Sequence, residues 1–212
     1  MKKQTGFTLI ELAIVLVIIG LLLGGVLRGQ ELINSAKVKN MANDFRSIPV
    51  YIYGYQDKFK SLPGDDRAAA DHVGGENPAG TKAGNGAIDG AWNSEALATE
   101  SVLFWQHVRL AGLATGSTNL PATAGANAFY PTNSDGGRIG VSSTNPITDL
   151  PGAYFMCSGG ILGKFAKQLD TTIDDGTPNG GSFRASATAL GTANEAAGAY
   201  VDNTAYTVCT GF

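Results

Sequence analysis

Charged residues, cysteine and histidine are all scarce in this chain, and each shortage narrows what the protein can do. Of 212 residues only 16% are charged, 15 basic against 18 acidic, and there are two cysteines and two histidines. The basic residues are scattered and form no cluster that would neutralise phosphates, so the sequence gives no support for nucleic-acid binding. The 29 glycines, with plentiful Thr, Ser and Asn, favour a loop-rich, strand-containing extracytoplasmic domain over a helical cytosolic enzyme.

The sequence also lacks the residue sets on which most catalytic and metal sites depend. No Gly-x-Ser-x-Gly motif occurs, and His72 and His107 do not have the spacing of metal ligands. The paired aspartates at 65–66 and 174–175 are adjacent within turn-like segments, so they would not flank one substrate. These absences disfavour a membrane-tethered periplasmic enzyme, and we expect a protein with no catalytic activity.

One long apolar run stands out against this background. Residues 7–27 contain a single charge, Glu11. As a helix with a rise of about 1.5 Å per residue, the run would be about 30 Å long, which matches the hydrocarbon core of a bilayer. A carboxylate in such a helix costs about 3 kcal/mol or more in lipid, so Glu11 is expected to be functional and to need a partner.

The flanks of the run predict its orientation. Lys2 and Lys3 precede it, whereas Arg28 is soon offset by Glu31. The positive-inside rule therefore places the N-terminus in the cytoplasm and residues 28–212 outside it. The run is longer than a secretory signal core and is not followed by an Ala-x-Ala cleavage site, although a plain signal anchor remains an alternative.

The orientation bears on the two cysteines. Cys157 and Cys209 would lie in an oxidising compartment, where a pair is expected to form a disulfide. The alternative is two buried thiols. A bridge between them would close a loop of about 50 residues and would stabilise the fold by about 4 kcal/mol in the chain-entropy model.

Residues 2–12 read Lys-Lys-Gln-Thr-Gly-Phe-Thr-Leu-Ile-Glu-Leu. This stretch resembles the prepilin N-terminus of type IV pilins and of type II secretion pseudopilins, nearly residue for residue. The resemblance implies that a prepilin peptidase cleaves between Gly6 and Phe7, removing residues 1–6. It also implies that the same enzyme N-methylates the new amine of Phe7 and that the apolar helix is retained.

The resemblance assigns Glu11 a role in filament assembly. In a bundle of such helices, the carboxylate of Glu11 would neutralise the Phe7 amine of a neighbouring subunit and so set the axial register. The alternative is a carboxylate that extends to the membrane interface.

The function implied is that of a structural subunit of a type IV pilus-like filament, a polymer of this chain and other pilins. An inner-membrane assembly platform would extrude it, so the subunit would lie in the bacterial inner membrane before assembly and on the cell surface afterwards. Two alternatives are a pseudopilin of type II secretion and a minor or tip pilin with an adhesive role. Many major pilins have a proline just after the membrane segment, where this chain has Arg28.

Beyond residue 27 the pattern predicts that the helix continues over residues 28–60. One amphipathic stripe runs through this part, and Pro49 lies inside it and is expected to bend the helix. The stripe consists of Met41, Phe45, Ile48, Ile52, Tyr55 and Phe59. The segment Leu62-Pro63-Gly64-Asp65-Asp66 is expected to end the helix with a turn.

Residues 61–212 are expected to form a globular extracytoplasmic head. We predict a long loop over 74–90, a helix over 94–113, and strands over 138–142, 153–157 and 199–209, with both cysteines at strand ends. A short helix between the last two strands would carry Ile161, Leu162, Phe165 and Leu169. The expected fold class is therefore α+β and pilin-like: a long bent helix on a small antiparallel sheet, with a disulfide-closed C-terminal loop.

Inside that loop, Asp170, Asp174 and Asp175 form an acidic segment that ends in glycine-rich residues. Hard cations prefer several oxygen ligands on a turn, and some pseudopilins bind calcium in a loop of this region. The spacing is not that of an EF-hand, and Asp-Asp-Gly is also an ordinary turn. Calcium is therefore one interpretation of the segment and a plain turn is the other.

Overall fold

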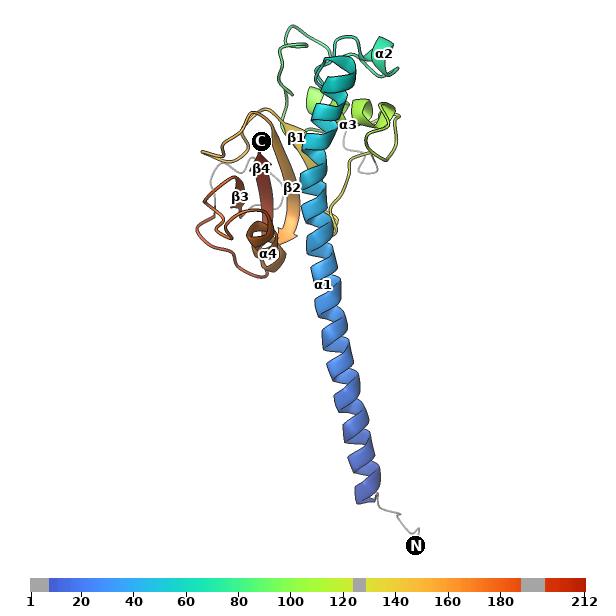
Figure 1. Ribbon diagram of the computed structural model, residues 1–212, viewed down its shortest axis with the longest axis vertical. Helices are drawn as coiled ribbons and strands as arrows, with labels where there is room; N and C mark the ends of the chain where they lie inside the picture. The colour runs from blue at the N-terminus through green and yellow to red at the C-terminus, as the bar shows by residue number, and fades with distance from the viewer. Residues whose placement is uncertain (1–7, 124–128, 188–196) are drawn as a thin grey trace. The chain divides into compact units, whose positions relative to one another are not determined.

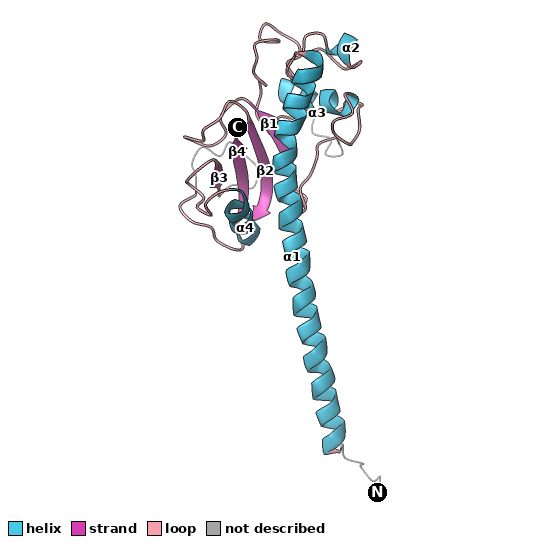
Figure 2. Cartoon of the chain, in the orientation of Figure 1, coloured by secondary structure: helices cyan, strands magenta, loops and turns pink. Residues whose placement is uncertain are grey.

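The computed structural model describes residues 8–123, 129–187 and 197–212, and it shows an α+β fold (Figures 1 and 2). The elements, in chain order, are α1 (Leu9–Phe59), α2 (Ala69–His72), α3 (Glu100–Leu110), β1 (Ile139–Ser142), β2 (Phe155–Leu162), α4 (Gly163–Ile173), β3 (Phe183–Ser186) and β4 (Ala205–Gly211). The chain divides into two compact units, with the boundary inside α1 between Lys37 and Val38.

The first unit ends at Lys37, and its described residues form the N-terminal part of α1. Its large apolar side chains are exposed along its whole length, from Leu9 to Ile33. Helices in proteins gain most of their stability by packing an apolar face against other elements, and the apolar side chains of this unit have no such cover among the described residues.

The second unit, Val38–Phe212, is called the head from this point, and it is built around a four-stranded antiparallel sheet with the strand order β1-β2-β4-β3. β2 is the longest strand, and its pairing with β4 shifts between Ser158 and Ile161. The two intervening residues are glycines, and Gly160 has a positive φ of 70°. Glycine adopts this conformation without a steric penalty, which explains how the strand accommodates the irregularity.

The C-terminal part of α1 supplies one wall of the head core. Its buried side chains are Val38, Met41, Ala42, Phe45, Ile48, Ile52 and Tyr55. They recur every three or four residues, which confirms the predicted stripe; Phe59 at its end is only partly buried. Phe45 meets Phe183 of β3 edge to face, with ring centroids 5.2 Å apart.

Helix α1 passes through Pro49 without a break and ends at Phe59. Lys60 then takes a positive φ of 55°, and its N–H donates to the carbonyl of Gln56 (2.8 Å). The predicted end of the helix is thus confirmed. The bend at Pro49 remains a prediction.

Several boundaries in the head differ from those predicted, and the three largest differences are at the start of α3, the end of β2 and the start of β4. Helix α3 begins at Glu100, six residues later than expected, because residues 94–99 form turns in which Ser94 and Thr99 hydroxyls hydrogen-bond each other (3.0 Å). Strand β2 continues to Leu162, so Ile161 and Leu162 belong to a strand and not to the following helix. β4 begins at Ala205 instead of residue 199.

Long-range pairing accounts for these differences. Ile161 lies opposite Tyr206 of β4 and is fully buried, so the partner strand determines its conformation. Phe165 and Leu169 do lie on a helix, α4, as predicted. Strand β3, which sequence patterning missed, has only four residues, and it owes its place to pairing with β4.

Candidate assembly helix and head sites

The first turn of α1 has a self-contained hydrogen-bond arrangement. One carboxylate oxygen of Glu11 accepts hydrogen bonds from the Thr8 N–H (2.8 Å) and from the Thr8 hydroxyl (2.8 Å). The Glu11 N–H in turn donates to the Thr8 hydroxyl oxygen (3.3 Å). This is a capping box, in which a Thr at the N-cap and a Glu three residues later satisfy each other's backbone donors. The Thr-x-x-Glu spacing of a capping box can be recognised in the sequence. The apolar residues around Glu11, taken alone, instead indicate a partner outside the chain.

The other predicted residues of the N-terminus lie outside the described residues. Gly6 and Phe7, the expected cleavage and methylation positions, precede residue 8, where the described structure begins. Their roles remain predictions, and so does the pairing of Glu11 with the amine of a neighbouring subunit.

By length and composition, α1 is the one helix among the described residues that is able to cross a membrane. Gly20, Gly24, Gly25 and Gly29 lie along it, and no atom is near the space that a side chain would occupy at any of the four. Small residues at such spacings allow close approach of a second helix in lipid.

The cysteines form a disulfide, as predicted. Cys157 of β2 and Cys209 of β4 lie directly opposite each other in the register of the two strands. Both are fully buried, in a small cluster with Trp92, Ile147, Leu150 and Phe155. The prediction that they lie at strand ends was wrong, since each has strand residues on both sides. The bridge therefore links the two central strands and encloses α4 and β3.

The three aspartates of the acidic segment converge at the end of α4. One carboxylate oxygen from each of Asp170, Asp174 and Asp175 lies within 4.8 Å of those of the other two. Each carboxylate also has protein donors. Asp174 accepts from the backbone N–H groups of Ser182 (2.6 Å) and Phe183 (3.1 Å), and Asp175 accepts from the Thr177 hydroxyl (2.6 Å).

Asp170 is the buried member of this cluster. It accepts a hydrogen bond from the Tyr200 hydroxyl (2.6 Å) and another from the Gly176 N–H (3.0 Å). Burial raises the pKa of Asp170; the two hydrogen bonds oppose this rise, and the charges of Asp175 and Asp174 add to it. The arrangement secures the turn after α4 and also places three hard oxygen ligands together, so a divalent cation at this cluster stays a prediction.

The Leu62–Asp66 turn is secured to α3 by His107. The Gly64 N–H donates to His107 Nδ1 (2.9 Å), and the other ring nitrogen lies 2.8 Å from the Glu76 carbonyl oxygen. Nδ1 must therefore accept and Nε2 must donate, which fixes the neutral tautomer. His107 is fully buried, and burial lowers its pKa. Gly64 has a φ of 91°, and a side chain there would collide with the Glu100 carbonyl.

The two aspartates of the turn each serve a structural role. Asp65 accepts backbone hydrogen bonds from Gly84, Asn85 and Gly86, which holds the predicted loop against the turn. Asp66 has different partners from Asp65. The two carboxylates therefore do not form a pair suited to acid–base catalysis.

Asp66 is almost fully buried and lies between two aromatic groups. It accepts from the Tyr55 hydroxyl (2.8 Å) and contacts His72 Nδ1 (2.6 Å). Burial alone would raise the pKa of Asp66, but the hydrogen bonds from His72, Tyr55 and the Ala68 N–H outweigh it and lower the pKa. Little in the sequence signals this triad, because its members belong to three separate segments.

Comparison with known protein families identifies the N-terminal segment of the chain. Residues 1–27 match the family model of the prokaryotic N-terminal methylation motif. The chain carries a prepilin-type N-terminal segment. No curated protein and no solved structure matches the chain.

The prepilin-type segment agrees with the rest of the molecule. A long N-terminal helix with an apolar span, a small antiparallel sheet and a disulfide in the C-terminal region together make a pilin-like α+β fold. The apolar helix that follows the prepilin-type cleavage motif is consistent with membrane anchoring. The motif is that of structural pilins and pseudopilins, proteins that assemble and do not catalyse.

Proposed function

We propose that this protein is a structural subunit of a type IV pilus-like filament. The observation that carries the proposal is the prepilin-type segment at residues 1–27, together with the apolar stretch of α1 that it contains, whose large hydrophobic side chains are exposed. Moving this apolar surface out of water, into lipid or against other helices, is favourable by on the order of 25 cal/mol for each Å² buried. Polymerisation through this helix supplies the missing burial.

In this proposal, prepilin peptidase removes residues 1–6 and methylates Phe7 while the helix anchors the protein in the inner membrane, with the N-terminus cytoplasmic and the head periplasmic. An assembly platform then transfers the subunit into a filament of this chain and other pilins at the cell surface. The activity is association and requires no cofactor.

Glu11 is the residue on which the proposal is tested. Within one chain its carboxylate is bonded to Thr8, so the helix end is stable before assembly. In the filament the same carboxylate would meet the methylated amine of an adjacent subunit, a charged donor that makes a stronger hydrogen bond than a neutral hydroxyl. Assembly would then exchange one partner of Glu11 for another.

We expect Glu11→Ala to insert into the membrane and to be cleaved, but to be missing from filaments. The measurement is mass spectrometry of sheared surface filaments and of membranes, which reports both abundance and the N-terminal residue. Glu31→Ala, on the same helix, is the matched control, because its exposed carboxylate contacts Arg28 one turn earlier (3.1 Å). Normal incorporation of Glu11→Ala, or an uncleaved Met1 in mature filaments, would overturn the proposal.

A pseudopilin of type II secretion is the second candidate. Arg28 in place of a proline after the apolar run favours it, whereas the disulfide-closed C-terminal region favours a pilin. Deleting the gene separates the two. Loss of surface filaments with normal secretion indicates a pilin, and loss of secreted proteins with no change in filaments indicates a pseudopilin.

A further inference from the structure

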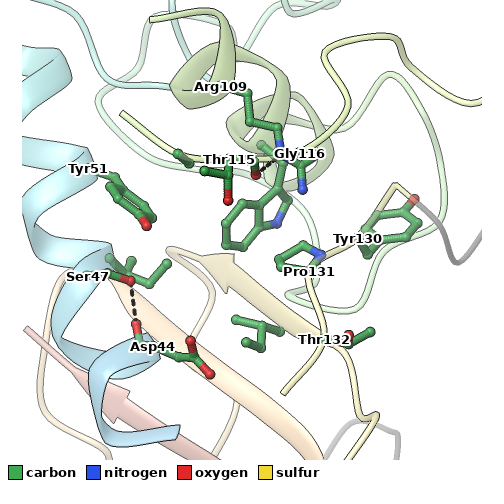
Figure 3. Close-up of a pocket in the computed structure, with 13 residues that line it drawn as sticks. Asp44, Ser47, Tyr51, Arg109, Thr115, Gly116, Tyr130, Pro131 and Thr132 are labelled. Atoms are coloured by element: carbon green, nitrogen blue, oxygen red, sulfur yellow. Dashed lines mark hydrogen bonds between the residues drawn. The ribbon is translucent and has the colours of Figure 1, made fainter. Parts of the chain in front are cut away.

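The head contains a pocket of about 390 Å³ that lies between α1, α3 and the segment leading into β1 (Figure 3). Its volume is within the range of small-ligand sites, about 300–1,000 Å³. The side chains that give the pocket its charge and its aromatic walls are Asp44, Ser47, Tyr51, Trp105, Arg109 and Tyr130.

Asp44 is the unusual member of this lining. Its side chain is partly buried, and among the described residues no donor or cation contacts its carboxylate oxygens. The Ser47 hydroxyl donates to the backbone carbonyl of Asp44 (2.8 Å) and not to the carboxylate. Burial alone raises the pKa of Asp44 to about 6. A carboxylate in this position is charged at neutral pH, and no hydrogen bond or ion pair among the described residues offsets its partial burial.

Arg109, the one guanidinium on the pocket wall, has other partners. Its Nε donates to the Thr115 carbonyl (3.1 Å), and a terminal nitrogen donates to the Ser117 carbonyl (3.0 Å). The guanidinium also lies 4.8 Å from the centre of the Phe129 ring. Arg109 therefore shapes the loop after α3 and leaves the Asp44 carboxylate without a counter-ion.

Aromatic side chains complete the environment around the carboxylate. Tyr51 extends from the same face of α1 as Asp44, and both face Thr115 and Pro131 across the pocket (Figure 3). Trp105 also lines the cavity. Aromatic faces attract cations by about 0.5–2 kcal/mol each, and the rings also accept an apolar chain. A carboxylate and aromatic side chains that line the same pocket fit a positive head group on a short hydrocarbon stem.

We propose that this pocket binds an ammonium or guanidinium group carried on an apolar stem, with the Asp44 carboxylate as its counter-ion. A neutral polyol would fill the space but would leave the carboxylate unpaired, which is why the cation is the better occupant. This site is independent of the prepilin-type segment, so it stands whether the protein acts in a pilus or in secretion.

The test uses the full-length protein in a non-ionic detergent with two matched probes, n-butylguanidinium and its neutral analogue n-butylurea. Binding is followed by the NMR signal of the Trp105 indole N–H, identified with a Trp92→Phe variant. We expect a saturable shift with butylguanidinium and at least tenfold weaker binding of butylurea. Asp44→Asn should abolish the difference between the probes. Asp57→Asn, an exposed position on the same helix, should preserve it.

A pH series gives a second readout. The other titratable groups that line the pocket are Tyr51 on α1, Arg109 on α3 and Tyr130 before β1, and tyrosine and arginine do not change charge between pH 5 and 7.5. Protonation of Asp44 should therefore weaken butylguanidinium binding about tenfold over this range, and Asp44→Asn should show no such dependence.

Several results would overturn the proposal. They are equal affinity for the two probes, unchanged preference in a folded Asp44→Asn variant, or no saturable shift with either probe. Competition of butylguanidinium by a methyl glucoside, at a strength independent of pH, would indicate a polyol site instead. Near-ultraviolet circular dichroism of Asp44→Asn establishes that the variant retains its tertiary structure.

Discussion

The two units of the chain differ in how far they bury the same kind of side chain, as two isoleucines show. Ile18, in the N-terminal part of α1, is 50% exposed, whereas Ile52, on the same helix but in the head, is 0% exposed. The local sequence around both is helical. The difference is that the head supplies a sheet and a second helix to cover its stripe, while the first unit supplies nothing. The head thus buries its own apolar stripe, whereas the apolar side chains of the first unit stay exposed and are left for the lipid or neighbouring helices of the proposed filament.

Glu11 of the first unit also differs from two buried ionisable groups of the head. Asp66 and His107 each have several hydrogen-bond partners in distant segments of the chain. In the first unit, Glu11 is exposed and satisfied only by Thr8 one turn away. A carboxylate whose partners are one N–H and one neutral hydroxyl can still accept a charged donor, as the proposed filament contact requires.

The largest effect on stability that would sharpen this comparison is loss of the disulfide. We expect Cys157→Ala with Cys209→Ala to lower the free energy of unfolding of the head by about 4 kcal/mol, because the bridge closes a 52-residue separation. Urea denaturation of full-length protein in detergent measures the loss. Membrane insertion should be unaffected. A loss no greater than that of a surface substitution would contradict the prediction.

The pair Ile52→Ala and Ile18→Ala tests the comparison directly. Truncating the fully buried Ile52 should lower the free energy of unfolding of the head by about 3 kcal/mol, through lost transfer energy and a cavity. The same substitution at the exposed Ile18 should leave head unfolding unchanged. Equal effects of the two variants on the denaturation midpoint would mean that the units do not behave separately.

A smaller effect concerns pH and His107. The neutral form is favoured in the folded state, so the folded pKa lies below the ordinary value of 6.5. As pH falls below about 6.5, the unfolded chain takes up the proton first, and stability is lost by up to about 1.4 kcal/mol per pH unit until the folded pKa is reached.

Other groups act in the opposite direction. Asp44 and Asp170 have raised pKa values, so their protonation increases the stability of the folded state as pH falls. The measurement is therefore the difference between wild type and His107→Gln. The free energy of unfolding of wild type minus that of His107→Gln should shrink between pH 7.5 and 5. The His72→Gln control still contains His107, so it should still show the loss of stability that His107 causes at low pH. A difference that is independent of pH would rule out the assigned tautomer.

The smallest expected effect is that of calcium on the head. If the cluster of Asp170, Asp174 and Asp175 binds the ion, calcium should raise the melting temperature by a few degrees, because binding to the folded state alone stabilises it. Asp175→Asn should remove the rise, and Asp202→Asn, at an exposed head position, should not. A melting temperature that neither calcium nor chelator moves would leave the cluster as a turn.

The sequence alone determined the features that depend on local pattern. The apolar run, the Thr-x-x-Glu start, the stripe from Met41 to Tyr55 and the end of α1 all follow from residues within a few turns of one another. Helical periodicity and capping act over three or four residues, so they are legible without knowledge of the fold.

Tertiary structure alone decided the features that depend on distant partners. Strand β3 exists because β4 pairs with it, and Ile161 is in a strand because Tyr206 lies opposite. The cysteines face each other in mid-strand, His107 reaches the turn at Gly64 across 43 residues, and the pocket at Asp44 requires α1 and α3 together. Long-range pairing and burial are collective, so no short window of the chain encodes them.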